Sequence, residues 1–138
     1  MNLLIINGPN LNRLGKREPE YYGDTPFEDY FLHLQEQFPE IELEYFQSNS
    51  EGKLIDCLHA ADGKYTGIIL NAGAYTHTSL ALADAVATLS TVLVEVHISN
   101  IFAREKIRRK SFVAPYCKGT VTGFGLDSYR LAILSFLQ

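Results

Sequence analysis

Short apolar runs alternate with longer amphipathic segments along the chain. The runs at residues 3–6 and 67–71, "LLII" and "GIILN", are almost wholly apolar. Runs of this kind are typical of strands that are buried on both faces of a sheet. Residues 27–38 instead repeat at helical spacing, with apolar side chains at Phe27, Tyr30, Phe31, Leu34 and Phe38. The pattern therefore predicts a regular succession of strands and helices.

The whole chain divides into five strands and five helices on this basis. The expected strands span residues 3–6, 41–47, 67–71, 91–99 and 119–125. The expected helices span residues 27–38, 50–61, 79–89, 103–110 and 127–137. Thr25, Pro26 and Glu28 predict a capping box with proline in the first turn of the first helix, and Ser50 predicts a cap for the second.

Apolar strands joined by helical crossovers form a parallel sheet that is covered on both faces. We therefore predict an α/β fold, a flavodoxin-like doubly wound three-layer sandwich with a five-stranded parallel sheet in the order 2-1-3-4-5. The length of 138 residues corresponds to one domain, which we expect to span residues 1–138.

Composition is that of an ordinary globular protein, with 46% apolar and 20% charged residues. The formal charge of −4 gives no general attraction to a polyanion, so we expect no nucleic-acid partner. The first ten residues have no basic region and no long apolar run, so we expect no signal or membrane segment and a cytoplasmic location. Cys57 and Cys117 lack CxxC spacing and are expected to be reduced, structural thiols.

The segments that follow the strands carry unusually specific polar residues. In a doubly wound sheet, ligands bind outside the carboxyl ends of the strands, where these segments converge. The first of them, residues 7–25, is nineteen residues long. Connections longer than about 12–15 residues in a compact domain are usually functional lids or disordered segments. We therefore predict a functional site at this edge, with a mobile loop at about residues 15–25.

Glu95 and His97 form the first candidate pair. They lie two residues apart in an apolar strand, which places both side chains on one face. Burying an unpaired carboxylate costs on the order of several kcal/mol, so Glu95 is expected to pair with His97. A satisfied core pair is the structural alternative. The position at the carboxyl edge favours an acid–base function, in which the carboxylate orients and charges the imidazole.

The remaining histidines give weaker signals. His33 and His59 lie in amphipathic helices, where ordinary surface or half-buried positions are expected. A metal site made of Glu95, His97 and His77 is the weaker alternative to acid–base chemistry, because no HExxH or comparable ligand spacing is present. We therefore expect no metal.

Arg17 and Tyr22 form the second candidate pair, within the stretch "GKREPEYYGD". A tyrosine has an ordinary pKa near 10, so it acts as a base only where its phenolate is stabilised. A guanidinium within hydrogen-bonding reach stabilises a phenolate, and Arg17 is the candidate. A solvated loop with surface tyrosines is the structural alternative, which we accept for Tyr21.

Four long segments resemble the type II 3-dehydroquinate dehydratases, and together they extend from the first strand to the last helix. They are "INGPNLNRLGKREPEYYG", "ILNAGAYTHTS", "EVHISNIFAREKIRRKS" and "GFGLDSYRLAI". The resemblance implies reversible dehydration of 3-dehydroquinate to 3-dehydroshikimate, the third step of the shikimate pathway. It also implies an anti elimination through an enolate, without metal, Schiff base or other cofactor.

The resemblance also implies roles for the site residues. Tyr22 would be the base, Arg17 would hold it as phenolate, and His97 would be the acid that protonates the leaving hydroxyl. Glu95 would keep His97 oriented and charged, and Asn10 would position a water at the enolate oxygen.

Substrate-binding residues follow from the same resemblance. The hydroxyls and the carboxylate would be held by Asn71, His77 and Arg108 and by the backbone amides of Ile98 and Ser99. Asp84 would come from a neighbouring subunit of a homo-oligomer, expected to be a dodecamer built as a tetramer of trimers. Arg104 and Arg109 would have supporting roles.

Two single residues and one short stretch depart from the family pattern, and none of them is a proposed catalytic group. Ala83 stands where a basic residue is frequent, Phe102 stands where histidine is frequent, and the "LDS" of the last segment also differs. The departures at Ala83 and Phe102 concern subunit contacts and the surroundings of the carboxylate, and we interpret the "LDS" departure as related to the fold. Either a biosynthetic or a quinate-degrading pathway would use the same elimination.

Two other functional classes fit the same fold. A flavin- or nucleotide-binding module would need a phosphate loop after the first strand, but "NGPNLNRLG" contains neither GxGxxG nor GxxxxGK[ST]. A receiver-like regulatory domain would need acidic residues after the first strand and an aspartate after the third. Asn7 and Asn71 occupy those positions.

Overall fold

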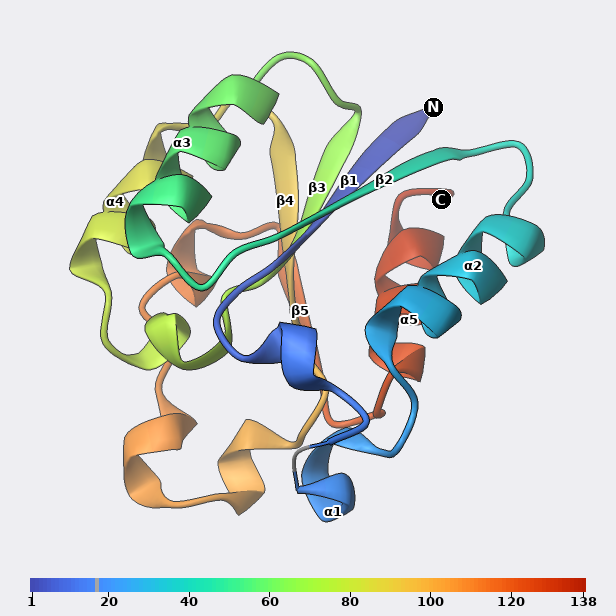
Figure 1. Ribbon diagram of the computed structural model, residues 1–138. Coiled ribbons are helices and arrows are strands. Elements are labelled where there is room, and N and C mark those ends of the chain that lie inside the picture. The colour runs from blue at the N-terminus through green and yellow to red at the C-terminus, as the bar shows by residue number, and fades with distance from the viewer. Residues whose placement is uncertain (17) are drawn as a thin grey trace.

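A five-stranded parallel sheet forms the centre of the protein, as the computed structural model shows for residues 1–16 and 18–138 (Figure 1). The strands are β1 (Asn2–Asn7), β2 (Glu42–Gln47), β3 (Gly67–Asn71), β4 (Val92–His97) and β5 (Gly119–Thr122). They lie in the order β2-β1-β3-β4-β5, and every neighbouring pair is parallel. The predicted fold class and strand order are therefore confirmed.

Helices cover both faces of this sheet (Figure 1). On one face lie α2 (Phe27–Gln37) and α5 (Asp127–Ser135), and on the other lie α3 (Glu51–Ala61) and α4 (Leu80–Thr88). Successive side chains of a strand point to opposite faces, so β1 contributes to both cores. Leu3 and Ile5 belong to the core beneath α2 and α5, whereas Leu4 and Ile6 belong to the core beneath α3 and α4.

The predicted helix at residues 103–110 is wrong. The chain there forms two 3-10 turns, η3 (Ile101–Ala103) and η4 (Lys106–Arg109). An α-helix gains most of its stability by packing an apolar face. The basic segment has no such face, because Ile107 is 68% exposed and its neighbours are charged.

The two predicted helix caps have different outcomes. Ser50 caps α3 as predicted, since its hydroxyl accepts a hydrogen bond from the Lys53 amide at 3.3 Å. The capping box at Thr25 is wrong. Extended Pro26 is the N-cap of α2, so Thr25 lies one residue too early, and no side-chain cap bond forms.

Short turns rather than long loops occupy much of the carboxyl edge of the sheet. Between β1 and α2 the chain forms η1 (Leu11–Arg13) and α1 (Pro19–Tyr22), and after β3 it forms η2 (Gly73–His77). A further turn, η5 (Ala114–Tyr116), precedes β5. The strand β5 ends at Thr122, earlier than predicted, because Gly123 with φ 95° turns the chain away.

Within the described residues, no helix combines the length and apolar character needed to cross a bilayer.

Candidate functional site

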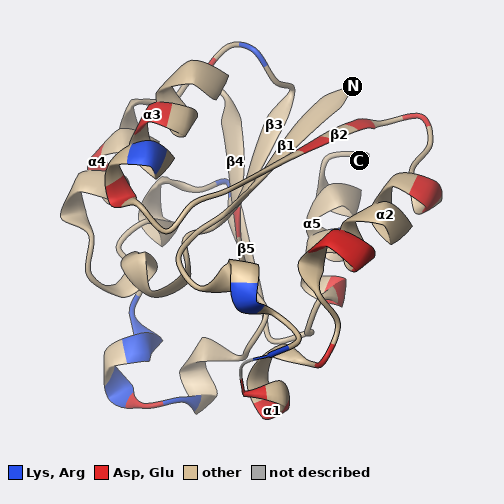
Figure 2. Ribbon diagram, viewed as in Figure 1, with Lys and Arg blue, Asp and Glu red and all other residues tan. Residues whose placement is uncertain are grey.

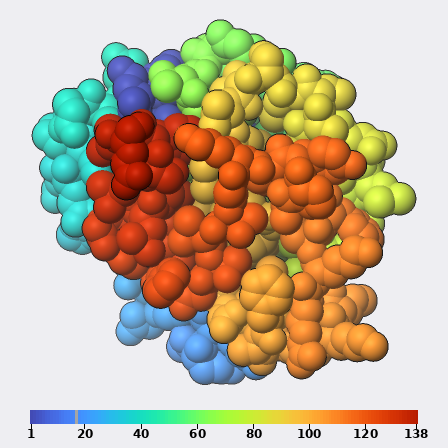
Figure 3. Space-filling view, turned by 180° about the vertical axis from the view of Figure 1, so that it is seen from behind, coloured from blue at the N-terminus to red at the C-terminus, as the bar shows by residue number. Residues whose placement is uncertain are grey.

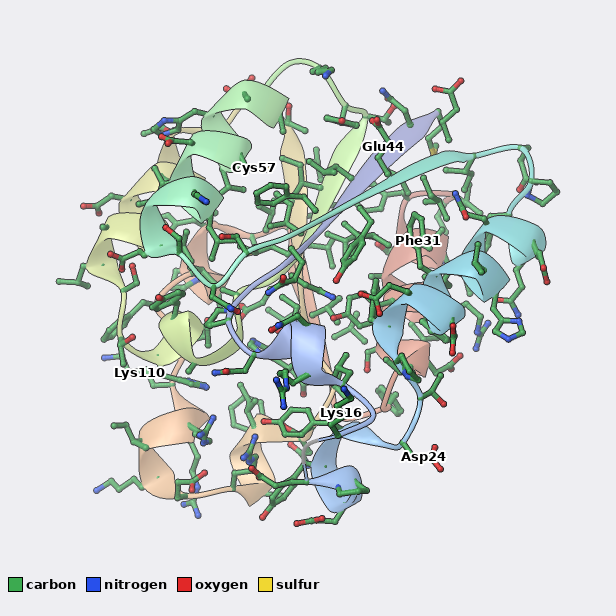
Figure 4. The ribbon with its side chains drawn as sticks, in the orientation of Figure 1. Lys16, Asp24, Phe31, Glu44, Cys57 and Lys110 are labelled. Carbon is green, nitrogen blue, oxygen red and sulfur yellow. The ribbon has the colours of Figure 1, made fainter. Side chains whose placement is uncertain are left out.

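The predicted site residues converge on a pocket at the carboxyl edge of the sheet. Its empty volume is about 510 Å³. Eight of the predicted residues line it: Asn10, Tyr22, Asn71, His77, His97, Ile98, Ser99 and Arg108. In Figure 4, Lys16 and Lys110 mark two segments at this end of the molecule, before α1 and after η4. Residues that are far apart in the sequence thus meet as the parallel sheet requires.

His97 lies at the end of β4 and is bound by the carboxylate of Glu95. Its Nε2 hydrogen-bonds Oε2 of Glu95, and both side chains are almost fully buried. The expected pairing on one face of the strand is therefore confirmed. Because Nε2 is engaged by Glu95 while the residue lines the pocket, Nδ1 is the ring nitrogen left to meet a ligand.

Two hydroxyl groups hold Glu95 in its ionised form. The hydroxyls of Thr76 and Ser111 donate to the same Oε2 at 2.9 and 2.7 Å. Burial alone would raise the pKa of Glu95, but the hydrogen bond and charge of His97, together with the bonds from Ser111 and Thr76, lower it below its usual value. Sequence reasoning missed Thr76 and Ser111, because neither lies near Glu95 along the chain.

His77 stacks against His97 in the pocket wall. The two rings lie 6.1 Å apart between centroids at 23°. Its Nδ1 lies 2.8 Å from the carbonyl oxygen of Lys110, which only accepts, so Nδ1 carries the proton. Burial lowers the pKa of His77, and the charge of His97 adds to that effect. A neutral His77 with a protonated Nδ1 presents Nε2 as a hydrogen-bond acceptor.

Tyr22 lies at the end of α1 and meets the guanidinium of Arg104, which follows η3. Nη1 of Arg104 donates to its hydroxyl at 2.6 Å, and both side chains are buried, with exposed fractions of 9% for Arg104 and 7% for Tyr22. Sequence reasoning gave Arg104 only a supporting role and assigned this task to Arg17. Arg17 lies outside the described residues, so its role stays a prediction. The position of Arg104, a basic residue a few positions after the end of β4, is the signal that could have pointed to this contact.

Asn71 is fixed by a buried network at the ends of two neighbouring strands. Its Nδ2 donates to the hydroxyl of Tyr129, which donates to Oδ1 of Asn7, both at 2.8 Å. Its Oδ1 accepts from the amide of Gly73 at 3.1 Å. These partners set which end of the amide is oxygen and leave one N–H of Nδ2 for a ligand. Sequence reasoning assigned no role to Tyr129 and missed this contact.

Asn10 and Arg108 lie at the rim of the pocket. Asn10 has a left-handed backbone with φ 68°, and its amide donates to Oδ1 of Asn49 at 3.0 Å. This conformation turns the chain out of β1 toward the pocket. Nε of Arg108 lies 2.7 Å from a carboxylate oxygen of Glu105, which leaves the terminal nitrogens of a half-buried guanidinium for an anion.

Two predicted residues lie outside the pocket lining. Glu95 lies behind His97 and contacts its Nε2, and its predicted orienting role stays a prediction. Asp84 is exposed on α4 and is not among the lining residues. Its predicted contribution from a neighbouring subunit stays a prediction.

Among residues 1–16 and 18–138, no cluster of three or more His, Cys, Asp or Glu side chains has the arrangement of a metal site. The pocket instead brings a cation-bound phenol and a carboxylate-bound imidazole to the same space. A phenol beside a cation is suited to removing a proton, and an imidazole beside a carboxylate is suited to donating one. The arrangement therefore fits a reaction with one base and one acid.

Known proteins match this chain over nearly its entire length. The family model described as "Dehydroquinase class II" matches residues 1–137. The 3-dehydroquinate dehydratases of Exiguobacterium sp. and Bacillus licheniformis are each 52% identical to it. The alignments cover 100% and 99% of this chain and 95% and 96% of those proteins. The crystal structure of a type II dehydroquinase from Butyrivibrio crossotus superimposes with a TM-score of 0.96 at 43% identity, covering 100% of this chain and 98% of that one.

Proposed function

Because the chain belongs to the class II dehydroquinase family, we propose that the pocket binds 3-dehydroquinate and that Tyr22 and His97 are its base and acid. The reaction is the reversible dehydration of 3-dehydroquinate to 3-dehydroshikimate, the third step of the shikimate pathway, and the protein is a lyase of this kind. The observation that supports the assignment of roles is that Tyr22, paired with Arg104, and His97, paired with Glu95, line the same pocket.

The first step removes a proton from the carbon next to the ketone. Tyr22 takes this proton as phenolate, and the electron pair of the broken C–H bond moves toward the ketone oxygen to give an enolate. Arg104 favours the phenolate, because its guanidinium lies 2.6 Å from the oxygen in a buried, low-dielectric position. Arg17 would add to this effect. Asn10, at the pocket rim, would position a water against the enolate oxygen.

The second step expels the hydroxyl group. The enolate electrons form the new carbon–carbon double bond as the C–O bond breaks, and His97 gives its proton so that water leaves. Glu95 keeps the imidazole charged before this transfer. Tyr22 ends protonated and His97 ends neutral, so one proton must pass back to His97 and one must leave Tyr22 before the next cycle.

Binding contacts follow from the groups that the pocket presents. The substrate is a carboxylate anion, and Arg108 with the backbone amides of Ile98 and Ser99 would receive that group. The free N–H of Asn71 and the acceptor Nε2 of His77 match substrate hydroxyls.

The assembly and location are part of the same proposal. A homo-oligomer, a dodecamer of four trimers, would allow the exposed Asp84 of one subunit to reach the pocket of another. The described residues include two free cysteines, Cys57 and Cys117, and free thiols suit the reducing cytoplasm.

The test is the formation of 3-dehydroshikimate from 3-dehydroquinate, followed by its absorbance. Tyr22→Phe and His97→Ala are each expected to lower kcat by roughly 10²–10⁴-fold, the usual contribution of an acid or base. Tyr116→Phe removes a hydroxyl from an exposed tyrosine outside the pocket and is expected to retain full activity. Near-normal turnover in either pocket variant would remove that residue from its role. Addition of EDTA is expected to leave the rate unchanged.

A further inference from the structure

Tyr21 lies directly beside Tyr22 on α1, yet it contacts Arg104 in a different way. The centroid of its ring lies 4.2 Å from Cζ of Arg104, well within the range of a cation–π interaction. The corresponding distance for the Tyr22 ring is 5.4 Å. Arg104 therefore meets two consecutive tyrosines, one through its ring face and one through its hydroxyl.

The guanidinium of Arg104 is held from several sides. Nη1 also donates to the hydroxyl of Ser99 at 3.3 Å. Carboxylate oxygens of Glu18 and Glu105 lie 3.9 and 3.7 Å from Nη2 and Nε. Figure 3 shows the segment that contains α1 against the segment that contains Arg104 at the lower end of the molecule. In this setting Tyr21 covers a guanidinium that is only 9% exposed.

Two carboxylates compete with the Tyr22 hydroxyl for Arg104. Glu18 and Glu105 both attract Arg104, so either could draw it away from Tyr22. Other charged or titratable groups of the same pocket are His77, His97 and Arg108. Drawing Arg104 toward either carboxylate would rotate its guanidinium. A ring packed on its face restricts that rotation and excludes water, which strengthens the interaction with the Tyr22 oxygen.

We propose that Tyr21 is a positioning residue of the reaction: its ring holds the guanidinium of Arg104 in the orientation that stabilises the phenolate of Tyr22. This inference rests on the proposed role of Tyr22 as the base. Its ring is the active part, because the face of the ring makes the contact. Its hydroxyl is not needed.

A purely structural role for Tyr21 fits the surroundings less well. The side chain is 42% exposed and belongs to neither of the two hydrophobic cores. Its ring meets that of Tyr22 edge-on, at 6.2 Å between centroids and 70°. Removing it should therefore open no core cavity and leave the fold intact.

The test is the pH dependence of kcat with 3-dehydroquinate for the wild type, Tyr21→Ala and Tyr21→Phe. A base that acts as phenolate gives a rate that falls on the acidic side of the pH profile. Losing a cation–π contact at a partly exposed site should shift this acidic limb to higher pH by about half a unit. At a fixed pH on the limb, this shift lowers kcat about threefold. Tyr21→Phe keeps the ring and should superimpose on the wild type.

Controls separate this inference from the proposed function. Tyr116→Ala removes a similarly exposed tyrosine from η5 and should leave both the limb and kcat unchanged. If the acidic limb of Tyr21→Ala lies at the same pH as that of the wild type, or if Tyr21→Phe shifts it equally, the positioning role of Tyr21 is overturned. In that case an inactive Tyr22→Phe variant would still support Tyr22 as the base. Full activity in Tyr22→Phe would instead overturn the base itself, and the positioning role with it.

Discussion

Glu95 shows how single residues set the chemistry of the pocket. A carboxylate with 1% exposure needs hydrogen-bond donors, and His97, Thr76 and Ser111 all contact its Oε2. These donors come from β4, from η2 and from the segment after η4. The ionised state of Glu95 is therefore fixed by tertiary contacts rather than by the strand alone.

Replacing Ser111 with alanine tests this dependence through stability. Because the folded pKa of Glu95 is lowered, its carboxylate stabilises the fold fully above the unfolded pKa of about 4.3, and this contribution is lost as pH falls through the folded value. Ser111→Ala removes one donor and raises the folded pKa. We expect the free energy of unfolding to fall by about 1–3 kcal/mol at pH 7 and by less at lower pH. Urea unfolding at several pH values measures this difference.

Ser135→Ala is the matched control for that measurement. It removes a serine hydroxyl that donates to the carbonyl of Ala132 at 2.6 Å, where no carboxylate is involved. Its effect on the free energy of unfolding should not vary between pH 7 and pH 3.5. If the loss in the free energy of unfolding of Ser111→Ala is also constant with pH, Ser111 does not stabilise the ionised form of Glu95.

At the scale of elements, the contact between the ends of β1 and β3 positions residues that line the pocket. The Gly8 amide donates to the carbonyl oxygen of Asn71 at 2.7 Å. An added Cβ at Gly8 would lie 2.5 Å from the carbonyl oxygen of Ala72, which is backbone and cannot swing aside. Glycine is therefore required where the chain leaves β1, directly below Asn71 and Gly73.

Gly8→Ala should therefore harm both stability and activity. Forcing the ends of β1 and β3 apart is expected to cost about 1–3 kcal/mol, as other overpacking changes do. It should also lower kcat/KM, because the displaced backbone carries Asn71. Gly52→Ala is the control, since its Cβ would meet no atom closer than 3.9 Å and alanine favours the helix α3 by about 0.5–1 kcal/mol. Thermal unfolding measures the stability and the dehydration assay measures kcat/KM. A Gly8→Ala variant as stable and active as Gly52→Ala would show that position 8 does not require glycine.

These elements also show what the sequence could and could not predict. The apolar runs at residues 3–6 and 67–71 predicted β1 and β3, because wholly buried strands need apolar side chains on both faces. The pairing of Glu95 with His97 was predictable from their spacing of two. Arg104 lies 82 positions from Tyr22, and Tyr129 lies 58 positions from Asn71, so only the folded chain reveals these contacts. The 3-10 turns at η3 and η4 were mistaken for a helix because charged residues alone do not show whether a face is buried.

At the scale of the whole molecule, charge is distributed unevenly. The net charge is −4, yet basic side chains gather at the pocket end, on η1 and around η4, while acidic ones are frequent on α2, α3 and β2 (Figure 2). Exposed Arg13 and Lys16, with Asn10 and Glu18, line a hollow of about 630 Å³ that shares Asn10 with the pocket. A carboxylate substrate would approach along this local positive potential.

A double change of Arg13 and Lys16 to glutamine tests that approach. Without these two charges, kcat/KM for 3-dehydroquinate is expected to fall about threefold at low ionic strength, with kcat unchanged, because they act before the chemical step. The deficit should disappear at about 0.5 M salt, where screening acts over only a few ångströms. Steady-state rates at several salt concentrations measure both quantities.

The control makes an equal change of charge at the opposite edge of the sheet. Lys64 and Lys118 are exposed and lie just before β3 and β5, so they flank the amino ends of strands rather than the pocket. Changing both to glutamine should leave kcat/KM unaltered at every salt concentration. Equal losses in the two double variants would mean that net charge, rather than its position, governs the approach. A loss at Arg13 and Lys16 that persists in high salt would instead mean that these side chains touch the substrate directly.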